Sequence, residues 1–285
     1  MNYLSEITIN SFIRMALAED VGQGDHSSLA SIPAGDQSTA LLKAKADGVV
    51  AGISLAERIL LMVDDTLKFK SHFRDGQLIT IDDLVMEISG NSQAILKAER
   101  LMLNCMQRMS GIATLTKQYV DAIQGTQASI LDTRKTTPNF RPFEKWAVLI
   151  GGGQNHRYNL EDMMMLKDNH IDCAGGIKAA VDRCNTYRKE KNLDIGLEVE
   201  TRDLGEVKQV LACEGVQRVM LDNMSSEEMK EAVLLIDHKI ETEASGGITL
   251  ENVKDAALSG VDFISIGALT HSYTSLDLSL VIKSI

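Results

Sequence analysis

Hydrophobic positions follow two different patterns along this chain, and the first covers its N-terminal part. Apolar residues at helical spacing predict helices over residues 8–20, 51–63 and 96–123, the last of them broken at Ser110-Gly111. Short runs of strand character lie at residues 40–46, 67–73, 78–81, 84–88 and 94–96. This mixture predicts an α+β domain with an antiparallel sheet.

The second pattern begins after Gln127, where short apolar runs recur and each ends in a charged or polar cluster. These runs cover residues 129–135, 163–170, 195–200, 219–223, 241–247 and 263–270. Helical stretches at 177–190, 203–213, 226–236 and 250–259 separate most of them, which predicts right-handed βαβ units and a parallel sheet. An open doubly wound sheet also fits this alternation. We favour a closed or nearly closed α/β barrel, because the polar strand ends must converge on one face.

The two patterns define the expected domains. Residues 1–112 form an N-terminal α/β sandwich, and residues 113–272 form the barrel. The segment from Leu276 to Ile282 alternates partly at period two, so we expect a tail of residues 273–285 to return to the N-terminal sheet as a last strand.

Composition narrows the class of protein. The 285 residues are 44% hydrophobic with a formal net charge of -11, which makes a nucleic-acid partner improbable. No apolar run approaches the roughly 20 residues of a membrane span, and the N-terminus lacks the features of a signal peptide. The four cysteines are scattered without metal-binding spacing. We therefore expect a cytoplasmic protein with reduced thiols and no membrane partner.

A basic stretch from Asp132 to Arg157 reverses the overall charge locally. Glu144 is its only acidic residue after Asp132. A solvated charge run is the simple alternative. Two of the chain's three prolines and a glycine triplet lie within the stretch, so we expect a shaped loop rather than a helix face. Arginine and lysine in such a loop suit a small ligand with several negative charges.

Three groups of polar residues lie at the strand ends. The cationic group is suited to a polyanion and consists of Arg134, Lys135, His156, Arg157 and Lys167. The carboxylates Glu198, Glu200 and Asp222 are suited to Mg²⁺ or sugar hydroxyls. The turns Ser245-Gly246-Gly247 and Ser265-Ile266-Gly267-Ala268 are suited to a phosphate.

Other features of the chain have simpler interpretations. We expect only one of Glu198 and Glu200, which lie on one strand, to point into the barrel mouth. The three methionines of residues 163–165 are expected to be core side chains. The glycines of residues 151–153 are expected to form a helix C-cap and a tight loop. Arg100, Asn104 and Arg108 share one helix face, and a polar solvent stripe explains them equally well.

Together these residues resemble the quinolinate phosphoribosyltransferase family over nearly the whole chain. The shared motifs are Ala18-Glu-Asp-Val-Gly-Gln-Gly-Asp, Glu99-Arg-Leu-Met-Leu-Asn, Ser110-Gly-Ile-Ala-Thr, Asp132-Thr-Arg-Lys-Thr, Gly152-Gly-Gln-Asn-His-Arg, Leu166-Lys-Asp-Asn-His, Glu198-Val-Glu, Leu221-Asp-Asn, Ser245-Gly-Gly and Gly267-Ala-Leu-Thr-His. One departure is Pro138-Asn139, where the family usually has Pro-Gly. We expect the turn to survive, because asparagine tolerates a left-handed backbone.

The resemblance implies a fold and a reaction. The fold is an N-terminal α/β sandwich packed on an open α/β barrel, in a homodimer or a hexamer built as a trimer of dimers. The reaction converts quinolinate and phosphoribosyl pyrophosphate into nicotinate mononucleotide, pyrophosphate and CO₂ in NAD biosynthesis, with Mg²⁺ and no organic cofactor.

The resemblance also implies roles for individual residues. Quinolinate would bind to Arg100 of the neighbouring subunit and to Thr133, Arg134, Lys135, His156, Arg157 and Lys167. Phosphoribosyl pyrophosphate would bind to Glu200, Asp222, Ser245, Gly246, Gly247, Ser265, Gly267 and Ala268. Glu200 and Asp222 would also hold Mg²⁺, directly or through water. The expected catalytic residues are Lys135, Lys167, Glu200 and Asp222.

Three other functions remain open from the sequence. A related transferase could act on a pyridine or another aromatic acid without decarboxylation. A Schiff-base aldolase could use Lys135 or Lys167 as its nucleophile, and borohydride would then trap a substrate adduct on that lysine. A non-catalytic sensor would bind phosphoribosyl pyrophosphate but would release no pyrophosphate with any acid.

Overall fold

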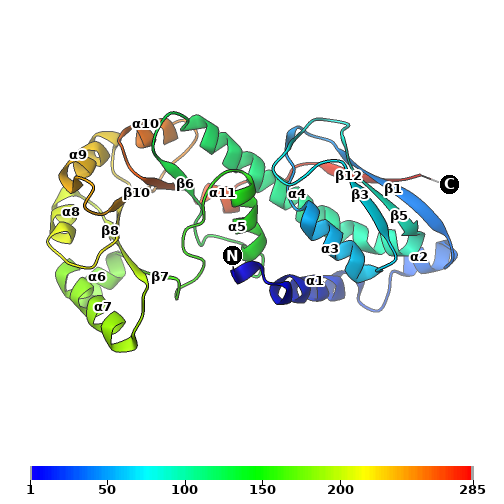
Figure 1. Ribbon diagram of the computed structural model, residues 1–285, viewed down its shortest axis with the longest axis horizontal. Coiled ribbons are helices and arrows are strands. Elements are labelled where there is room, and N and C mark those ends of the chain that lie inside the picture. The colour runs from blue at the N-terminus through cyan, green and yellow to red at the C-terminus, as the bar shows by residue number, and fades with distance from the viewer. Residues whose placement is uncertain (1, 284–285) are drawn as a thin grey trace. The chain divides into compact units, whose positions relative to one another are not determined.

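The computed structural model describes residues 2–283 and divides into two compact units (Figure 1). The N-terminal unit takes in the chain up to Lys117, the segment Thr136–Gly152 and the C-terminal segment from Ser272. The barrel unit takes in Gln118–Lys135 and Gly153–His271. These limits differ from the expected domain ranges mainly in residues 136–152, which pack with the N-terminal unit.

The N-terminal unit is built on an antiparallel sheet with the strand order β12-β1-β5-β3. Its strands are β1 (Gln37–Ala44), β3 (Lys68–Ser71), β5 (Leu84–Asn91) and β12 (Leu278–Lys283). β12 pairs with β1 from Ala44 to Thr39, which confirms the returning C-terminal strand. Ser284 and Ile285, the last residues of the expected tail, lie outside the described residues. The expected strand at 78–81 pairs elsewhere, because β4 (Leu78–Ile79) joins β2 (Gly48–Val49) in a separate sheet.

Helices complete the N-terminal sandwich. They are α1 (Glu6–Val21), α2 (His26–Ser31), α3 (Ile53–Val63), α4 (Ser92–Ala122) and α5 (Arg141–Ile150), preceded by a 3-10 turn at Asn2–Leu4. Figure 1 shows α3 and α4 running along one side of the sheet. The helix predictions at 8–20 and 51–63 are confirmed with small shifts at their ends. The predicted strand at 94–96 is wrong, because these residues form the first turn of α4.

The predicted break at Ser110-Gly111 is also wrong, because α4 continues through both residues. Packing explains why these two residues are small. A Cβ on Gly111 would overlap the carbonyl oxygen of Thr274. The Ser110 hydroxyl accepts a hydrogen bond of 2.9 Å from the backbone N–H of Ala51. The small pair therefore allows the backbone of another segment to approach the helix.

The basic stretch from Asp132 to Arg157 is not one continuous loop, because α5 lies within it. Pro142 occupies the first turn of α5, where its missing N–H costs no hydrogen bond. Glu144 and Lys145 are fully buried on this helix. Glu144 pairs with Arg108 at 3.0 Å, so part of the basic stretch serves the fold of the N-terminal unit. Asn139 has a φ of 63°, which confirms the expected left-handed turn.

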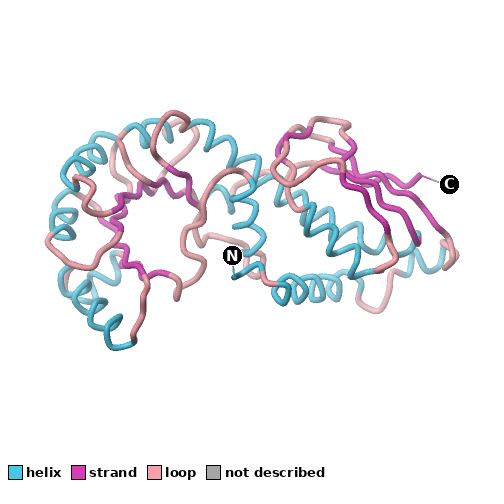
Figure 2. Tube along the Cα trace, in the orientation of Figure 1, coloured by secondary structure: helices cyan, strands magenta, loops and turns pink. Residues whose placement is uncertain are grey.

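The barrel unit contains a six-stranded parallel sheet with the strand order β6-β11-β10-β9-β8-β7. The strands are β6 (Ser129–Leu131), β7 (Met163–Leu166), β8 (Gly196–Thr201), β9 (Arg218–Asp222), β10 (Glu241–Ser245) and β11 (Phe263–Ser265). Figure 2 shows them as an arc with helices along its outer side. Among the strands of residues 2–283, β6 and β7 do not pair with each other. The expected open α/β barrel is therefore confirmed.

The helices of this unit are α6 (Asp168–Ala174), α7 (Ile177–Lys191), α8 (Leu204–Leu211), α9 (Ser226–Ile236), α10 (Val253–Leu258) and α11 (Ala268–His271). The helices α7 to α10 match the predicted positions. The short helices α6 and α11 were not predicted, since each lies within a run that we expected to extend a strand. They begin directly after β7 and β11, so their first residues lie beside the strand ends.

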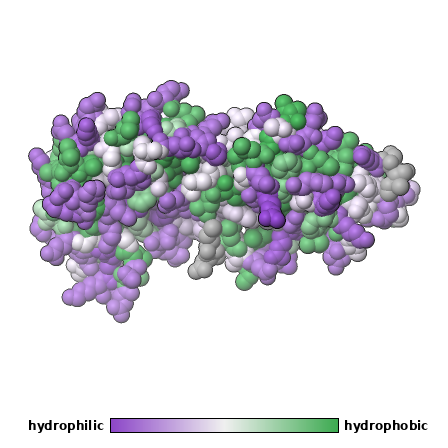
Figure 3. Space-filling model, turned by 45° about the horizontal axis from the view of Figure 1, so that its top comes forward, coloured by the Kyte–Doolittle hydropathy of each residue, from purple (hydrophilic) through white to green (hydrophobic). Residues whose placement is uncertain are grey.

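Hydrophilic residues cover much of the viewed surface, with smaller hydrophobic areas between them (Figure 3). Within residues 2–283, no helix combines the length and the apolar composition that crossing a membrane requires.

Candidate active site

A cavity of about 750 Å³ opens at the carboxyl ends of the barrel strands. Its walls include every site residue predicted within the barrel: Thr133, Arg134, Lys135, His156, Arg157, Lys167, Glu200, Asp222, Ser245, Gly246, Gly247, Ser265, Gly267 and Ala268. Residues far apart in sequence therefore meet here, as expected from parallel strands whose ends share one edge. Arg100 does not line this cavity, because it is an exposed residue of α4 in the N-terminal unit.

The cationic side of the cavity is held by specific contacts. Lys167, directly after β7, places its ammonium 2.6 Å from the Glu200 carboxylate on β8. The guanidinium of Arg157 donates to the carbonyl of Met163 at 2.9 Å and to the sulfur of Met165 at 3.6 Å. Burial, followed by the charge of Arg134, lowers the pKa of Arg157. The methionines of residues 163–165 are only half-buried, and Met165 lines the cavity. The expectation that they are simple core side chains is therefore corrected.

Glu198 and Glu200 both lie on β8 but differ in environment. Residues two apart on a strand share one face, yet the expectation that only one of the two points into the barrel mouth is confirmed. Glu200 lines the cavity, whereas Glu198 has no exposed surface and does not line it. The two carboxylates are therefore separated by depth in the barrel.

Glu198 belongs to a buried cluster around His156. The Nε2 atom of His156 lies 3.0 Å from Glu198 and 3.2 Å from Glu243 of β10. Arg218 lies 3.0 Å from the same oxygen of Glu243. Burial alone would lower the pKa of His156, but the hydrogen bonds with the two glutamates outweigh it and raise the pKa to about 9. Burial and the charge of Glu243 raise the pKa of Glu198.

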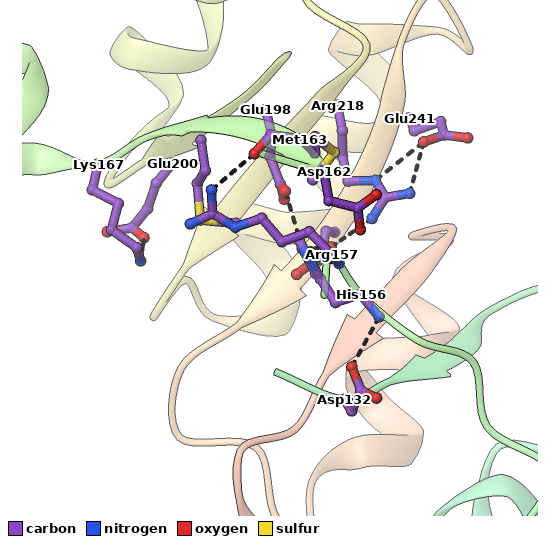
Figure 4. Close-up of polar contacts among 12 residues, drawn as sticks. Asp132, His156, Arg157, Asp162, Met163, Lys167, Glu198, Glu200, Arg218 and Glu241 are labelled. Carbon is purple, nitrogen blue, oxygen red and sulfur yellow. Dashed lines mark hydrogen bonds and ion pairs between the residues drawn. The ribbon is translucent and has the colours of Figure 1, made fainter. Parts of the chain in front are cut away.

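The backbone of His156 is fixed by Asp132, a fully buried residue that follows β6. Asp132 accepts a hydrogen bond of 2.9 Å from the His156 N–H and another of 2.6 Å from the side chain of Asn155. Figure 4 shows Asp132 below His156, with Glu198 on the other side of the ring. The first residue of the Asp132-Thr-Arg-Lys motif therefore supports the site from behind rather than lining it.

Turns after β9 and β10 interlock at the opposite wall. Asn223 adopts a left-handed backbone with φ 55° and donates from its side chain to Asp222 at 2.7 Å. Its backbone N–H donates to the Ser245 carbonyl at 2.8 Å. A Cβ on Gly246 would overlap the Asn223 side chain. The glycine is therefore required for the approach of the two turns, beyond any contact with a ligand.

The last turn of the site is tight for a similar reason. A Cβ on Gly267 would lie 2.9 Å from His271 Nε2 and 3.0 Å from Lys135 Cδ. The hydroxyl of Thr270 donates to the carbonyl of Lys135 at 2.8 Å. Gly267 and Thr270 together therefore position the loop that carries Lys135.

Sequence reasoning missed several residues of the cavity wall: Met165, Met220, Asn223, Glu243, Ile248, Thr249 and His271. The motifs Leu221-Asp-Asn and Gly267-Ala-Leu-Thr-His contained two of them, Asn223 and His271. Glu243 was visible only as one of two glutamates in a strand. Nothing in the sequence distinguishes the buried Glu243 from Glu241, whose side chain is 52% exposed.

Comparisons with known proteins agree along the chain. Residues 25–110 match the N-terminal domain of quinolinate phosphoribosyl transferase, and residues 112–281 match its C-terminal domain. A chloroplastic nicotinate-nucleotide pyrophosphorylase (carboxylating) of Arabidopsis thaliana is 49% identical, over 97% of this chain and 83% of that protein. A probable nicotinate-nucleotide pyrophosphorylase (carboxylating) of Synechocystis is 41% identical, over 96% of this chain and 92% of that protein.

Solved structures agree with the sequence comparisons. NadC from Streptococcus pyogenes superposes with a TM-score of 0.92 at 39% identity, over 99% of both chains. A nicotinate-nucleotide pyrophosphorylase from Francisella tularensis gives a TM-score of 0.92 at 35% identity, over 98% of both chains. The fold and the cavity are those of a barrel phosphoribosyltransferase. The chain belongs to the quinolinate phosphoribosyltransferase family.

Proposed function

We propose that this protein is a decarboxylating quinolinate phosphoribosyltransferase of NAD biosynthesis. It converts quinolinate and phosphoribosyl pyrophosphate into nicotinate mononucleotide, pyrophosphate and CO₂. The observation that carries this proposal is the cavity that the cationic group lines together with the carboxylates and the glycine turns. Each part of that wall matches one part of the two substrates, and the family membership of the chain supports the match.

The cationic wall suits the two carboxylates of quinolinate. Arg134, Arg157 and His156 line one region of the cavity together with Thr133. Guanidinium groups bind carboxylates through paired N–H donors, and a second carboxylate on the ring needs a second cationic partner. A monocarboxylate would leave part of this partly buried positive charge uncompensated, which disfavours it as the substrate.

The opposite wall suits phosphoribosyl pyrophosphate. Backbone N–H groups at the turns of Ser245, Gly246, Gly247, Ser265, Gly267 and Ala268 are suited to the 5′-phosphate. Lys135 and Lys167 are suited to the pyrophosphate. Glu200 and Asp222 are suited to the ribose hydroxyls.

The same two carboxylates fit a magnesium ion. Glu200 and Asp222 offer hard oxygen ligands on neighbouring strands β8 and β9, and both line the cavity. Bound there, directly or through water, Mg²⁺ would offset the negative charge of the pyrophosphate. The ammonium of Lys167 already pairs with Glu200, so this side chain is positioned to serve the same anion. No organic cofactor is needed for the reaction below.

The first step is a substitution at the ribose. The bond between the ribosyl carbon and the pyrophosphate oxygen breaks, and the pyridine nitrogen forms a new bond to that carbon. Lys135 and Lys167 stabilise the negative charge that develops on the departing oxygen. The carboxylates stabilise the cationic character of the ribosyl centre. The side chains act by fixed charge and orientation, without becoming covalently attached.

The second step is the loss of CO₂. The first step leaves a positively charged ring nitrogen next to the carbon that bears the 2-carboxylate. When the carbon–carbon bond breaks, its electron pair remains on the ring carbon, beside that charge, and a proton then replaces the lost group. The product of the first step therefore activates the second.

The assembly and the location belong to the same proposal. We propose a homodimer, alone or as part of a hexamer, in which Arg100 of one subunit completes the quinolinate site of its neighbour. The exposed position of Arg100 on α4 supports this role, because the side chain does not line the cavity of its own chain. We also propose a cytoplasmic location, although relatives from plants are named chloroplastic and mitochondrial.

The test is CO₂ release from carboxyl-labelled quinolinate with phosphoribosyl pyrophosphate and Mg²⁺, beside nicotinate as a competing substrate. Release that requires phosphoribosyl pyrophosphate, with little turnover of nicotinate, is the expected result. Turnover of nicotinate alone would overturn the substrate. Ligand binding without pyrophosphate release from any acid would instead favour a sensor, and a borohydride-trapped adduct on Lys135 or Lys167 would favour an aldolase.

A further inference from the structure

Two carboxylates with no role in the proposed reaction lie beneath the cationic wall. The side chains of Glu198 and Glu243 have no exposed surface, and both face the Nε2 atom of His156 at 3.0 and 3.2 Å. Figure 4 shows Glu198 directed at the imidazole and away from the ion pair of Lys167 with Glu200. Burying two carboxylates together is costly unless cations or hydrogen bonds compensate them. Their placement around one histidine therefore points to a role that acts through this shared partner.

Arg218 compensates one of the two charges. Its guanidinium lies 3.0 Å from Glu243 and 2.9 Å from Glu241, and it stacks over the Phe263 ring at 4.0 Å from the centroid. Ser265 adds a hydrogen bond to Glu243. Arg218 and Ser265 thus hold the Glu243 carboxylate in one orientation, and the oxygen that pairs with Arg218 also faces the imidazole of His156.

The imidazole of His156 is consequently held at both ring nitrogens. Nε2 carries a hydrogen toward the glutamates in the neutral tautomer as well as in the charged ring. Nδ1 lies 2.7 Å from the backbone N of Arg157. Both ring nitrogens therefore face protein atoms, and the orientation of the ring is tied to the position of the Arg157 backbone.

The same loop carries the next cationic residue of the wall. Asp132 fixes the backbone of His156 at 2.9 Å, and the Arg157 guanidinium reaches back to Met163 at 2.9 Å. The charge of Glu198 also acts favourably on Arg157. The ring itself touches the backbone N of Arg157 through Nδ1, so an imidazole that rotated away would lose this contact and alter the position of His156 relative to Arg157.

We propose that Glu198 and Glu243 are positioning residues for recognition of the pyridine dicarboxylate. They orient the His156 ring and so set the relative positions of His156 and Arg157, while Arg218 holds Glu243 in place. This role rests on the proposed function, since it names what aligns the quinolinate side of that site. Glu198 has no contact with the turns that are suited to the 5′-phosphate, whereas Glu243 is hydrogen-bonded to Ser265 in one of them. Glu198 therefore separates the quinolinate side of the site from the phosphoribosyl side more cleanly than Glu243 does.

The test compares Glu198→Gln and Glu243→Gln with the matched control Glu241→Gln. Glu241 lies on the same strand as Glu243 and pairs with the same Arg218. It differs from Glu243 in having no ion pair with His156. We expect KM for quinolinate to rise by ~10-fold or more in the first two variants, since each loses a buried carboxylate charge next to His156 Nε2. KM for phosphoribosyl pyrophosphate should stay within about twofold in Glu198→Gln and in the control, as should KM for quinolinate in the control. In Glu243→Gln only KM for quinolinate is compared, because this variant also changes the bond to Ser265.

Two further readouts separate positioning from general damage. The ¹⁵N signals of His156 in the ligand-free protein, assigned by their absence in His156→Gln, should move in Glu198→Gln and Glu243→Gln but not in Glu241→Gln. The effect of Glu198→Gln on KM should also largely disappear in the His156→Gln background, because residues that act through one group are not additive.

Additive effects, unmoved His156 signals, or an equal rise in both KM values of Glu198→Gln would overturn the proposal. If Glu198→Gln does not fold, the His156 signals and the KM for quinolinate of Glu243→Gln, compared with those of Glu241→Gln, test it instead. A wild-type protein that releases no CO₂ would overturn the proposed function instead. The histidine spectra would still test the contact in that case, because they require no turnover.

Discussion

The ammonium of Lys167 lies 2.6 Å from the carboxylate of Glu200, across the neighbouring strands β7 and β8. One partner is suited to the pyrophosphate and the other to the ribose and Mg²⁺. In the ligand-free protein the two groups therefore satisfy each other. Binding of phosphoribosyl pyrophosphate must exchange this ion pair for contacts with the substrate, so both side chains are already held near their working positions.

Lys167→Ala should lower kcat by ~10²–10³, the usual effect of removing one preorganised charge that stabilises a developing anion. Lys178→Ala is the control, because Lys178 forms an exposed ion pair with Asp182 on α7, and its removal should change kcat by about twofold at most. Steady-state pyrophosphate release measures both. An equal loss in the two variants would contradict a catalytic role for Lys167.

Arg100→Ala and Lys167→Ala test the proposed sharing of sites between subunits. Each variant alone should be inactive, because each damages every site. When the two variants are mixed in equal amounts, about half of the dimers contain one subunit of each kind. One of the two sites in each mixed dimer then has both native residues, so about a quarter of all sites should be intact. Activity is measured after the subunits are mixed and exchanged. No recovery in verified mixed dimers would argue against a site completed by Arg100 of a neighbour.

Gly246→Ala should destabilise the protein and weaken phosphoribosyl pyrophosphate binding. Its Cβ would overlap the Asn223 side chain, and Asn223 orients Asp222 through a 2.7 Å hydrogen bond. Gly247→Ala is the matched control, because Gly247 also has a positive φ but has open space around its Cα. Both variants place alanine in a left-handed backbone, which costs about 1–2 kcal/mol. The additional loss in Tm and the additional rise in KM of Gly246→Ala therefore report the overlap. Identical values in both variants would assign the effect to strain alone.

The raised pKa of His156 makes stability and quinolinate recognition depend on pH. The groups facing His156 are Glu198, Glu243, Asp132 and Arg157, and its pKa in the folded protein is about 9 against an ordinary value of 6.5. A raised pKa stabilises the fold fully below pH 6.5 and loses that contribution as the pH rises toward 9.

Tm should therefore fall between pH 6.5 and 9 more steeply in the wild type than in His156→Gln. The ratio kcat/KM for quinolinate should fall over the upper part of the same range, as the cationic ring is lost. Thermal scans in a pH series measure the first effect and initial rates the second. Parallel Tm curves for the two proteins would show that the ring does not titrate in this window.

Gly111→Ala should destabilise the protein by about 1–3 kcal/mol, the usual cost of overpacking. At an exposed position inside a helix, replacing glycine by alanine normally stabilises the protein by roughly 1 kcal/mol, so the expected effect has the opposite sign. The reason is the overlap with the Thr274 carbonyl. Gly35→Ala is the control, because no atom lies near its Cβ. Denaturant unfolding measures both, and a stabilised Gly111→Ala would show that the contact yields easily.

The sequence by itself determined the alternation of strands and helices in the barrel unit and, through the family resemblance, most of the cavity wall. Parallel strands bring their carboxyl ends to one edge of a sheet, so the polar ends of the predicted runs were sufficient to bring Arg134, Lys167, Glu200 and Asp222 together. The left-handed turn at Asn139 was equally local, since the residue type and the preceding proline decide it.

Only the tertiary structure decided what small and buried polar residues do. Ser110-Gly111 has the local signature of a helix break, yet a neighbouring backbone segment uses these residues for close approach. Glu198 and Glu243 are ordinary strand glutamates in sequence. In the structure both side chains point from their strands, β8 and β10, into the barrel interior, where they pair with the same His156. Burial and pairing depend on segments far apart in the chain, and local propensity carries no information about those distances.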